Sequence, residues 1–143
     1  MTTAVDASVL LDVVLDDPRY RDRSLRALKA ERRRGGLIVC PIVWAQVFSS
    51  ARDPETLGPL LERAGLAYDP FDRACADLAG RLFKHYRRVA GPRRSHALSD
   101  FMVGAHALTR GARLLSRDRA FYLRFFDGLQ VVEPAGVGTG GES

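Results

Sequence analysis

Five short runs, separated by stretches long enough for helices, most constrain the fold of this chain. They are Thr3–Val5, Leu37–Cys40, Arg113–Ser116 and Gln130–Val132, with a weaker run at Leu66–Tyr68. Apolar runs without polar alternation are typical of strands buried on both faces of a parallel sheet. Strands that alternate with helices therefore predict an α/β sandwich with a central, mostly parallel sheet of four to five strands.

Local signals predict where the helices begin and end. Ser8 is expected to cap a helix that ends near Leu15, and Pro18 to begin the next, which continues to about Arg34. Pro41 begins the helix after the second strand. Further helices are predicted over residues 53–65, 72–89, 98–109 and 121–126. The 143 residues fit one domain, covering residues 1–134, and we expect the Gly-rich tail, 135–143, to be disordered.

Composition excludes several classes of protein. The sequence has no apolar run long enough to cross a bilayer and no basic leader before its first apolar stretch, so we expect a cytoplasmic protein. Cys40 and Cys75 belong to no CxxC pair, which argues against zinc. The net charge is +5, and 20 of the 22 basic residues are Arg, which suggests an anionic partner such as nucleic acid. Before the motifs are considered, solvated Arg-rich helix faces explain this charge slightly better.

Three aspartates are predicted to meet at one edge of the sheet. Asp6 directly follows the first strand, Asp118 comes two residues after Ser116, and Asp100 begins a helix. Ligands of open α/β sheets bind outside the carboxyl ends of the strands. Each aspartate taken alone is explained as a helix cap. Three carboxylates at one edge instead indicate a site for a hard cation, Mg²⁺ or Mn²⁺.

Four stretches, in order, resemble the PIN-domain ribonucleases, especially the VapC toxins of bacterial toxin–antitoxin pairs. Ala4–Leu11 is similar to the opening motif, a strand that ends in the first Asp. Asp100–Ala107 resembles the third motif, Asp-x-x-Ile-Ala-Ala-x-Ala, and Ser116–Phe121 the fourth, Thr-Arg-Asp-x-x-Phe. Gly128–Pro134 resembles the closing strand, Gly-Leu-x-Val-x-x-Pro. The resemblance spans residues 2–134 and implies a PIN-like three-layer α/β/α sandwich.

The resemblance also implies an activity. In the family, an acidic quartet holds one or two divalent cations, which activate water to hydrolyse RNA phosphodiesters. Carried over to this chain, Asp6, Asp100 and Asp118 are the expected ligands of Mg²⁺ or Mn²⁺. The family further implies a VapB-type antitoxin that directs a basic side chain toward the acidic pocket, and a homodimer.

Gln46 departs from the family pattern at the fourth acidic position. The family's second motif carries a Glu on the helix after the second strand, and here that place is occupied by Gln46. A Gln offers one neutral oxygen and an amide donor where a Glu offers two anionic oxygens. The chain as given is therefore expected to be catalytically impaired. Three explanations stay open: an introduced inactivating substitution, which the intact remaining motifs favour, a natural variant, or a fourth acid supplied by Glu55 or Glu62.

Basic and hydroxyl side chains near the acids are candidates for binding RNA. Arg87, Arg88, Arg93 and Arg94 flank the loop before Asp100, and contact with phosphates or simple solvation explains them equally well. Ser8 and Ser116 are weaker candidates, either for phosphate contact or for support of the acids. We expect His96 to be structural. Trp44 and the aromatic residues of 121–126 are expected to pack in the core.

Two other functions compete with the nuclease. The first is an inert PIN-fold module that binds RNA or an antitoxin, its site having decayed at Gln46. The second is a phosphoacceptor domain of the receiver type, which also carries acids at a sheet edge. That chemistry needs a Lys after a late strand, and Lys29 and Lys84, the only lysines, lie elsewhere.

Overall fold

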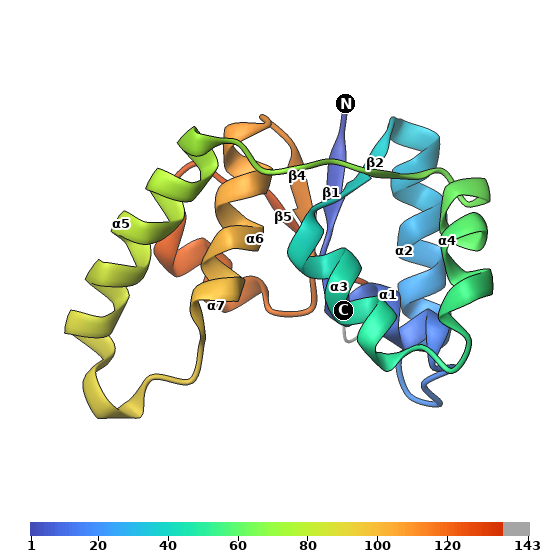
Figure 1. Cartoon of the computed structure of the whole chain (residues 1–143), viewed down its shortest axis with the longest axis horizontal. Coiled ribbons are helices and arrows are strands. Elements are labelled where there is room, and N and C mark those ends of the chain that lie inside the picture. The colour runs from blue at the N-terminus through green and yellow to red at the C-terminus, as the bar shows by residue number, and fades with distance from the viewer. Residues whose placement is uncertain (136–143) are drawn as a thin grey trace.

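A computed structural model describes residues 1–135 of the chain and contains a five-stranded parallel sheet (Figure 1). Its order is β3-β2-β1-β4-β5, and every neighbouring pair is parallel. The strands are β1 (Thr3–Val5), β2 (Leu37–Val39), β3 (Leu66–Tyr68), β4 (Arg113–Leu115) and β5 (Val131–Val132). The predicted disorder of the tail concerns residues that, except for Ala135, lie outside the described part.

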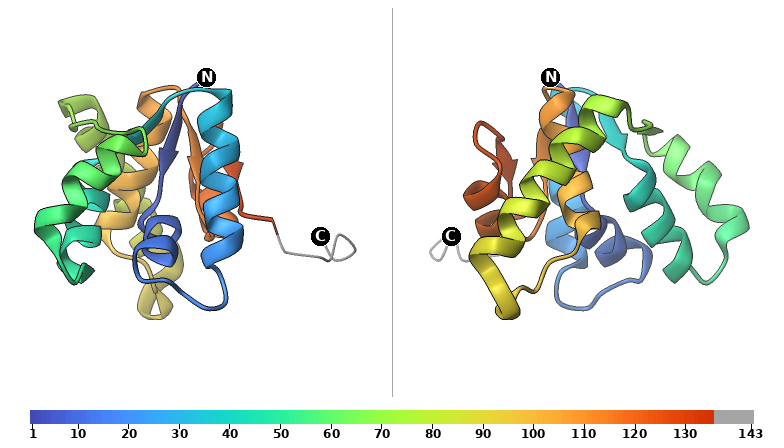
Figure 2. Two further views of the ribbon diagram at one scale, coloured as in Figure 1. Left: turned by 90° about the vertical axis from the view of Figure 1, so that its right-hand side faces the viewer. Right: turned by 60° about the vertical axis from the view of Figure 1, so that its left-hand side comes forward.

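Helices flank the sheet on both sides, so the predicted three-layer α/β/α sandwich is confirmed (Figures 1 and 2). The connections are helical throughout, because parallel neighbours need a crossover between them. The helices are α1 (Ala7–Val14), α2 (Arg21–Arg34), α3 (Pro41–Ser50), α4 (Pro54–Arg63), α5 (Arg73–Ala90), α6 (Leu98–Thr109) and α7 (Arg119–Phe125), with a short 3₁₀ turn, η1 (Gly91–Arg93).

Two predicted helix starts are wrong. Asp6, not Ser8, is the N-cap of α1, and its Oδ1 accepts the Ala7 N–H at 2.8 Å. The second helix begins at Arg21 instead of Pro18. The reason is Asp17, whose Oδ1 accepts the backbone N–H groups of Arg19 and Tyr20 at 2.8 and 2.9 Å. Such a side-chain-to-backbone turn competes with the helix and delays its start.

The hydrophobic core lies on both faces of the central strands. Val5, Val39, Leu114 and Leu115 are all at most 1% exposed. This burial on both faces is the physical reason for the continuous apolar runs in the sequence. Among the described residues, no helix combines the length and apolar character that a membrane span requires.

Two buried polar networks fix the ends of the central strands. Glu31 accepts the Thr3 hydroxyl at 2.9 Å and pairs with the Arg113 guanidinium at 2.7 Å. At the other end, Arg117 donates to both oxygens of Asp12, which also accepts the Ser24 hydroxyl at 2.6 Å. Because Arg117 precedes Asp118, the second network holds the turn that carries one of the predicted site residues.

Candidate active site

Asp6 and Ser116 meet because of the register between β1 and β4. Val5 pairs with Leu115, so the residues that follow each strand lie side by side at its carboxyl end. The Asp6 N–H donates to the Leu115 carbonyl at 2.9 Å, and the Ser116 hydroxyl donates to Asp6 Oδ2 at 2.6 Å. Ser116 is fully buried, and its oxygen also accepts the Asp118 N–H at 3.0 Å. One hydroxyl therefore links two of the predicted acids.

Asp118 does not cap α7 with its side chain, although it occupies the N-cap position. Its Oδ2 instead lies 2.7 Å from Nε2 of His96, in an ion-pair geometry. The imidazole is 23% exposed and stacks on Phe121, with ring centroids 3.7 Å apart and planes 2° apart. The structural role expected for His96 stays a prediction, and the structure adds a direct contact between this side chain and a site acid.

Asp100 joins the other two acids from the first turn of α6. Its Oδ2 accepts the Ala97 N–H at 2.9 Å, which closes the start of the helix. Burial raises the pKa of Asp6, and the negative charges of Asp100 and Asp118 raise it further, against the lowering effect of hydrogen bonds from Ser116 and Ala7. Carboxylates raise one another's pKa only at close range. The structure therefore gathers three of the predicted acids at one edge of the sheet.

Gln46 lies on α3, the helix that follows β2, as predicted. It is half-buried and borders the core face formed by Val43 and Val47. Within residues 1–135 its side-chain amide makes no hydrogen bond, whereas its backbone carbonyl accepts the Ser49 hydroxyl at 2.8 Å. The start of α3 is close to Asp6, because β1 and β2 are parallel neighbours in register, so Cys40 and Asp6 follow their strands side by side. The alternative fourth acids, Glu55 and Glu62, are exposed on α4.

The loop before α6 is held in place by one buried phenol. Tyr86 is 4% exposed, and its oxygen accepts the N–H groups of Ser95 and His96 at 2.8 and 3.0 Å. Its ring packs against Phe101, Phe121 and Phe125. The sequence carries no signal for this role, because a Tyr in the middle of an amphipathic helix is typical of ordinary packing.

The predicted RNA-binding residues divide into two groups. Ser116 is buried, and Ser8 accepts the Arg117 N–H at 3.3 Å, so both side chains support the acids, and phosphate contact stays a prediction. Arg87, Arg88, Arg93 and Arg94 are all exposed. The Arg87 guanidinium lies over the Phe83 ring, 5.0 Å from its centroid. Arg93 lines a cavity of about 500 Å³ that also borders Asp118.

The chemistry of these donors fits a hard divalent cation. The three acids offer only carboxylate oxygens, the ligands that Mg²⁺ and Mn²⁺ prefer. Burial raises the pKa of Cys40 to about 11, so this thiol stays protonated and is a poor ligand. Among residues 1–135, however, no three His, Cys, Asp or Glu side chains are grouped so that they could hold a metal ion. Asp118 faces His96, which occupies one of its oxygens.

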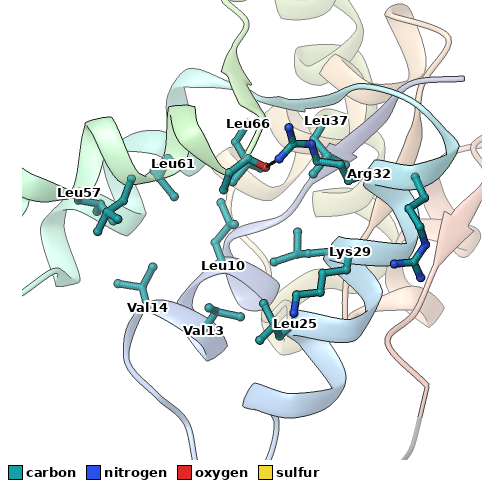
Figure 3. A pocket seen from close by; sticks show the side chains of 14 residues that line it. Leu10, Val13, Val14, Leu25, Lys29, Arg32, Leu37, Leu57, Leu61 and Leu66 are labelled. Atoms are coloured by element: carbon teal, nitrogen blue, oxygen red, sulfur yellow. Dashed lines mark hydrogen bonds between the residues drawn. The ribbon is translucent and has the colours of Figure 1, made fainter.

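A separate apolar groove lies between α1, α2 and α4, away from the acids. Its volume is about 710 Å³. Leu10, Val13 and Val14 of α1 face Leu57 and Leu61 of α4 across it, and Leu25 of α2 completes the wall (Figure 3). Three cationic side chains of α2, Lys29, Arg32 and Arg33, also line the groove.

Comparison with known proteins gives one family. The model of the PIN domain matches residues 3–124 of the chain. No curated protein matches the sequence.

Solved structures with the same fold come from toxin–antitoxin systems. VapBC2 from Rickettsia felis, bound to a DNA fragment from its promoter, has a TM-score of 0.73 at 17% identity, covering 93% of this chain and 98% of that one. DNA-bound VapBC from Salmonella typhimurium has a TM-score of 0.69 at 14% identity, covering 94% and 99%. VapC20 from Mycobacterium tuberculosis, described as a Sarcin-Ricin loop cleaving toxin, has a TM-score of 0.56 at 13% identity, covering 78% and 85%. At these identities the likeness shows a shared fold.

Proposed function

This chain belongs to the PIN-domain family, and we propose that it is the VapC-type toxin of a toxin–antitoxin pair, built to hydrolyse RNA with a divalent cation. The observation that carries the proposal is the arrangement at the carboxyl edge of the sheet, where the buried Ser116 hydroxyl bonds to both Asp6 and the backbone of Asp118, and Asp100 lies in the first turn of α6. Carboxylates held together against their mutual repulsion are what a cation site requires.

Each residue of the site has a distinct task in this mechanism. Asp6, Asp100 and Asp118 would hold Mg²⁺ or Mn²⁺ through carboxylate oxygens. A bound cation supplies a water of lowered pKa and offsets the charge that develops on the scissile phosphate. Ser116 orients Asp6 and the backbone of Asp118 at once, through bonds of 2.6 and 3.0 Å. Arg117, anchored on Asp12, keeps the turn that carries Asp118 in place.

Position 46 decides how active this exact chain is. A Glu there would add a fourth negative charge beside the three aspartates, and Gln46 instead contributes a neutral amide. We infer that the chain as written binds a cation weakly and turns RNA over slowly. The half-buried setting of Gln46 on α3 accommodates Glu, because the two side chains differ by one terminal atom.

RNA cleavage by the Gln46→Glu variant tests the nuclease proposal. We expect cleavage in Mg²⁺ or Mn²⁺ that stops on chelation, and growth arrest when the variant is expressed. The matched control is Gln46→Glu combined with Asp100→Asn, which should be inactive although it is folded. If Gln46→Glu cleaves no RNA in either metal, the proposed nuclease function is wrong.

Gln46 also favours a second candidate, a PIN-fold protein that binds RNA without cutting it. The exposed arginines around η1 and the net charge of +5 support RNA binding that weakens with salt. This candidate predicts no turnover even after Glu is restored. Cleavage by the Gln46→Glu variant would therefore exclude it.

We infer that the groove between α1, α2 and α4 takes a segment of the antitoxin. Its apolar walls suit the apolar face of a helix, and Lys29, Arg32 and Arg33 suit acidic side chains along the edge of that helix. Reversing charge with Arg33→Glu should weaken the complex with a co-expressed candidate antitoxin, whereas Arg52→Glu, on an exposed residue outside the groove, should not. Equal loss in both variants would contradict this placement. Assembly as a homodimer stays a prediction.

A further inference from the structure

We propose that the cavity between η1 and α7, beside Asp118, binds one unpaired nucleotide of the RNA next to the phosphate that is cut. The inference deepens the proposed nuclease function and rests on it. The cavity has a volume of about 500 Å³, within the range of about 300–1,000 Å³ that is typical of small-molecule sites. Asp118 forms part of its wall, so a ligand in the cavity lies next to one of the three acids.

The wall of the cavity has two chemical halves, which match the two halves of a nucleotide. Val89, Ala120 and Phe125 give it an apolar surface suited to the face of a base. Arg93 and Arg124 line the same cavity and supply cations suited to a phosphate. Both arginines are exposed, and within residues 1–135 neither forms an ion pair with an acid. Their charges are therefore available to a ligand.

The polar part of the cavity wall is already fixed before any ligand arrives. Ser95 and His96 both line the cavity, and their N–H groups are held by the buried Tyr86 oxygen. His96 is further fixed by its stack on Phe121 and its contact with Asp118. Binding to a preformed wall costs less ordering than binding to a loose loop. This rigidity separates the cavity from a merely solvated basic loop.

A second, smaller cavity continues the path of the nucleic acid. It has a volume of about 250 Å³ and shares Val89, Arg124 and Phe125 with the first cavity. Arg124 therefore borders both spaces, and its guanidinium lies 4.9 Å from the Phe125 ring centroid. Two adjoining cavities that share a cation suit consecutive nucleotides of a single strand, with a phosphate between them.

A nucleotide site in the cavity requires that some of the nearby arginines contribute more to RNA binding than others. Arg93 and Arg124 line the cavities, whereas Arg88, on α5, lines neither of them. If the attraction were diffuse and electrostatic, Arg88, Arg93 and Arg124 would contribute equally to RNA affinity, because each is exposed. Arg88→Ala is therefore the matched control for Arg93→Ala and Arg124→Ala.

The test uses the chain as it stands, with Gln46, in the presence of a chelator. Fluorescence anisotropy with a short labelled single-stranded RNA of mixed sequence gives the dissociation constants. We expect Arg93→Ala and Arg124→Ala each to weaken binding about tenfold, with a shallower salt dependence, and Arg88→Ala to change it less than about twofold. Equal losses in the three variants, or no loss in any, would overturn the nucleotide site.

A pocket-filling variant separates the cavity from its charge. Ala120 is exposed on the cavity wall, so Ala120→Trp narrows the space without altering charge or core. We expect it to weaken RNA binding about as much as Arg124→Ala does. If Gln46→Glu cleaves RNA while Ala120→Trp and Arg124→Ala bind as the parent does, the cavity inference fails and the nuclease stands. If Gln46→Glu cleaves nothing while both variants still lose RNA binding, the nucleotide site stands and the nuclease fails.

Discussion

Asp6 is a residue whose ionised form opposes folding. Burial and the charges of Asp100 and Asp118 raise its pKa above the ordinary value of 3.8. A carboxyl with a raised pKa binds its proton more tightly in the folded than in the unfolded chain. Folding is therefore weakened as the pH rises from about 3.8 through the raised pKa, and this deficit persists at neutral pH. Asp6 contributes to the site at a cost to stability.

We predict that Asp6→Asn stabilises the metal-free protein at pH 7. The neutral amide removes the penalty for a buried negative charge and keeps an oxygen for the Ala7 N–H. The advantage over the parent should shrink as the pH falls through the raised pKa of Asp6 and below about 3.8, where Asp6 of the parent becomes protonated in both the folded and the unfolded chain. Thermal unfolding at several pH values in the presence of a chelator measures this difference in stability, with Asp53→Asn as a surface control. An advantage that does not vary with pH would contradict the assignment.

At the residue scale, the sequence predicts the acids and offers Ser116 as their support, but it does not predict the contacts of His96 and Tyr86. Asp6, Asp100 and Asp118 are found because each stands at the end of a strand or the start of a helix, and such positions are local. The contact between His96 and Asp118 joins residues 22 apart, and Tyr86 reaches the N–H groups of Ser95 and His96 across the turn of η1. Such pairs depend on how α5, α6 and α7 pack, which no local pattern specifies.

Gly104 of α6 closely approaches Phe126, the residue that ends α7. A Cβ at Gly104 would collide with the Phe126 ring, which is itself 1% exposed. The third motif of the family pattern has Ala at this place, where this chain has Gly104. The close approach couples the helix that carries Asp100 to the residue that ends α7.

We predict that Gly104→Ala lowers the free energy of unfolding by about 1–3 kcal/mol, because overpacking a filled core outweighs the gain of about 1 kcal/mol in helix propensity. Phe126→Leu should make room for the methyl group, so the double variant should lose less than the sum of the two single variants. Denaturant unfolding of the four proteins measures the coupling. Strict additivity would show that the two side chains do not compete for the same space.

The turn between β4 and α7 is tethered to α1 by the pair of Arg117 and Asp12. The Asp12 side chain is 3% exposed and the Arg117 side chain 34%. In Arg117→Ala the buried Asp12 carboxylate keeps only its hydrogen bond from the Ser24 hydroxyl. We predict that the free energy of unfolding falls by about 3–5 kcal/mol. Asp12→Asn should cost less, because Arg117 can still reach water. Denaturant midpoints give this order, and equal losses would contradict it.

At the element scale, the sequence predicts the sheet well. Strands that are buried on both faces consist of continuous apolar residues, and elements exposed to solvent do not. The helix starts are less certain, since several residues compete for the same backbone groups. Asp17 turns the chain after Pro18, and Asp6 takes the cap that Ser8 seemed suited to provide. Both errors have the same cause, an aspartate that satisfies the backbone earlier in the chain.

Across the whole molecule, the apolar groove and the nucleotide cavity lie on different helices. The groove belongs to α1, α2 and α4, and the cavity to α5, η1 and α7, on opposite sides of Figure 1. The acids lie between them, at the carboxyl edge of β1 and β4. A partner held in the groove can therefore reach toward the acids without first occupying the space proposed for the RNA base.

We predict that the two surfaces respond independently to mutation. Leu60 lines the groove and is 51% exposed, so Leu60→Ser should weaken antitoxin binding without harm to the core. Its affinity for single-stranded RNA should stay within about twofold of the parent. Arg124→Ala should show the reverse pattern. The affinity of each variant is measured for the antitoxin and for single-stranded RNA. A variant that binds both partners more weakly would contradict the separation of the two surfaces.

We infer that position 46 and the three aspartates form one cation site, and electron paramagnetic resonance of bound Mn²⁺ can measure how much each residue contributes to it. Gln46→Glu adds a negative charge to that site, so the variant should bind Mn²⁺ about tenfold more tightly than the parent. Adding Asp118→Asn to the variant should abolish the gain. Saturable binding that is the same in the parent, in Gln46→Glu and in the double variant would contradict the claim.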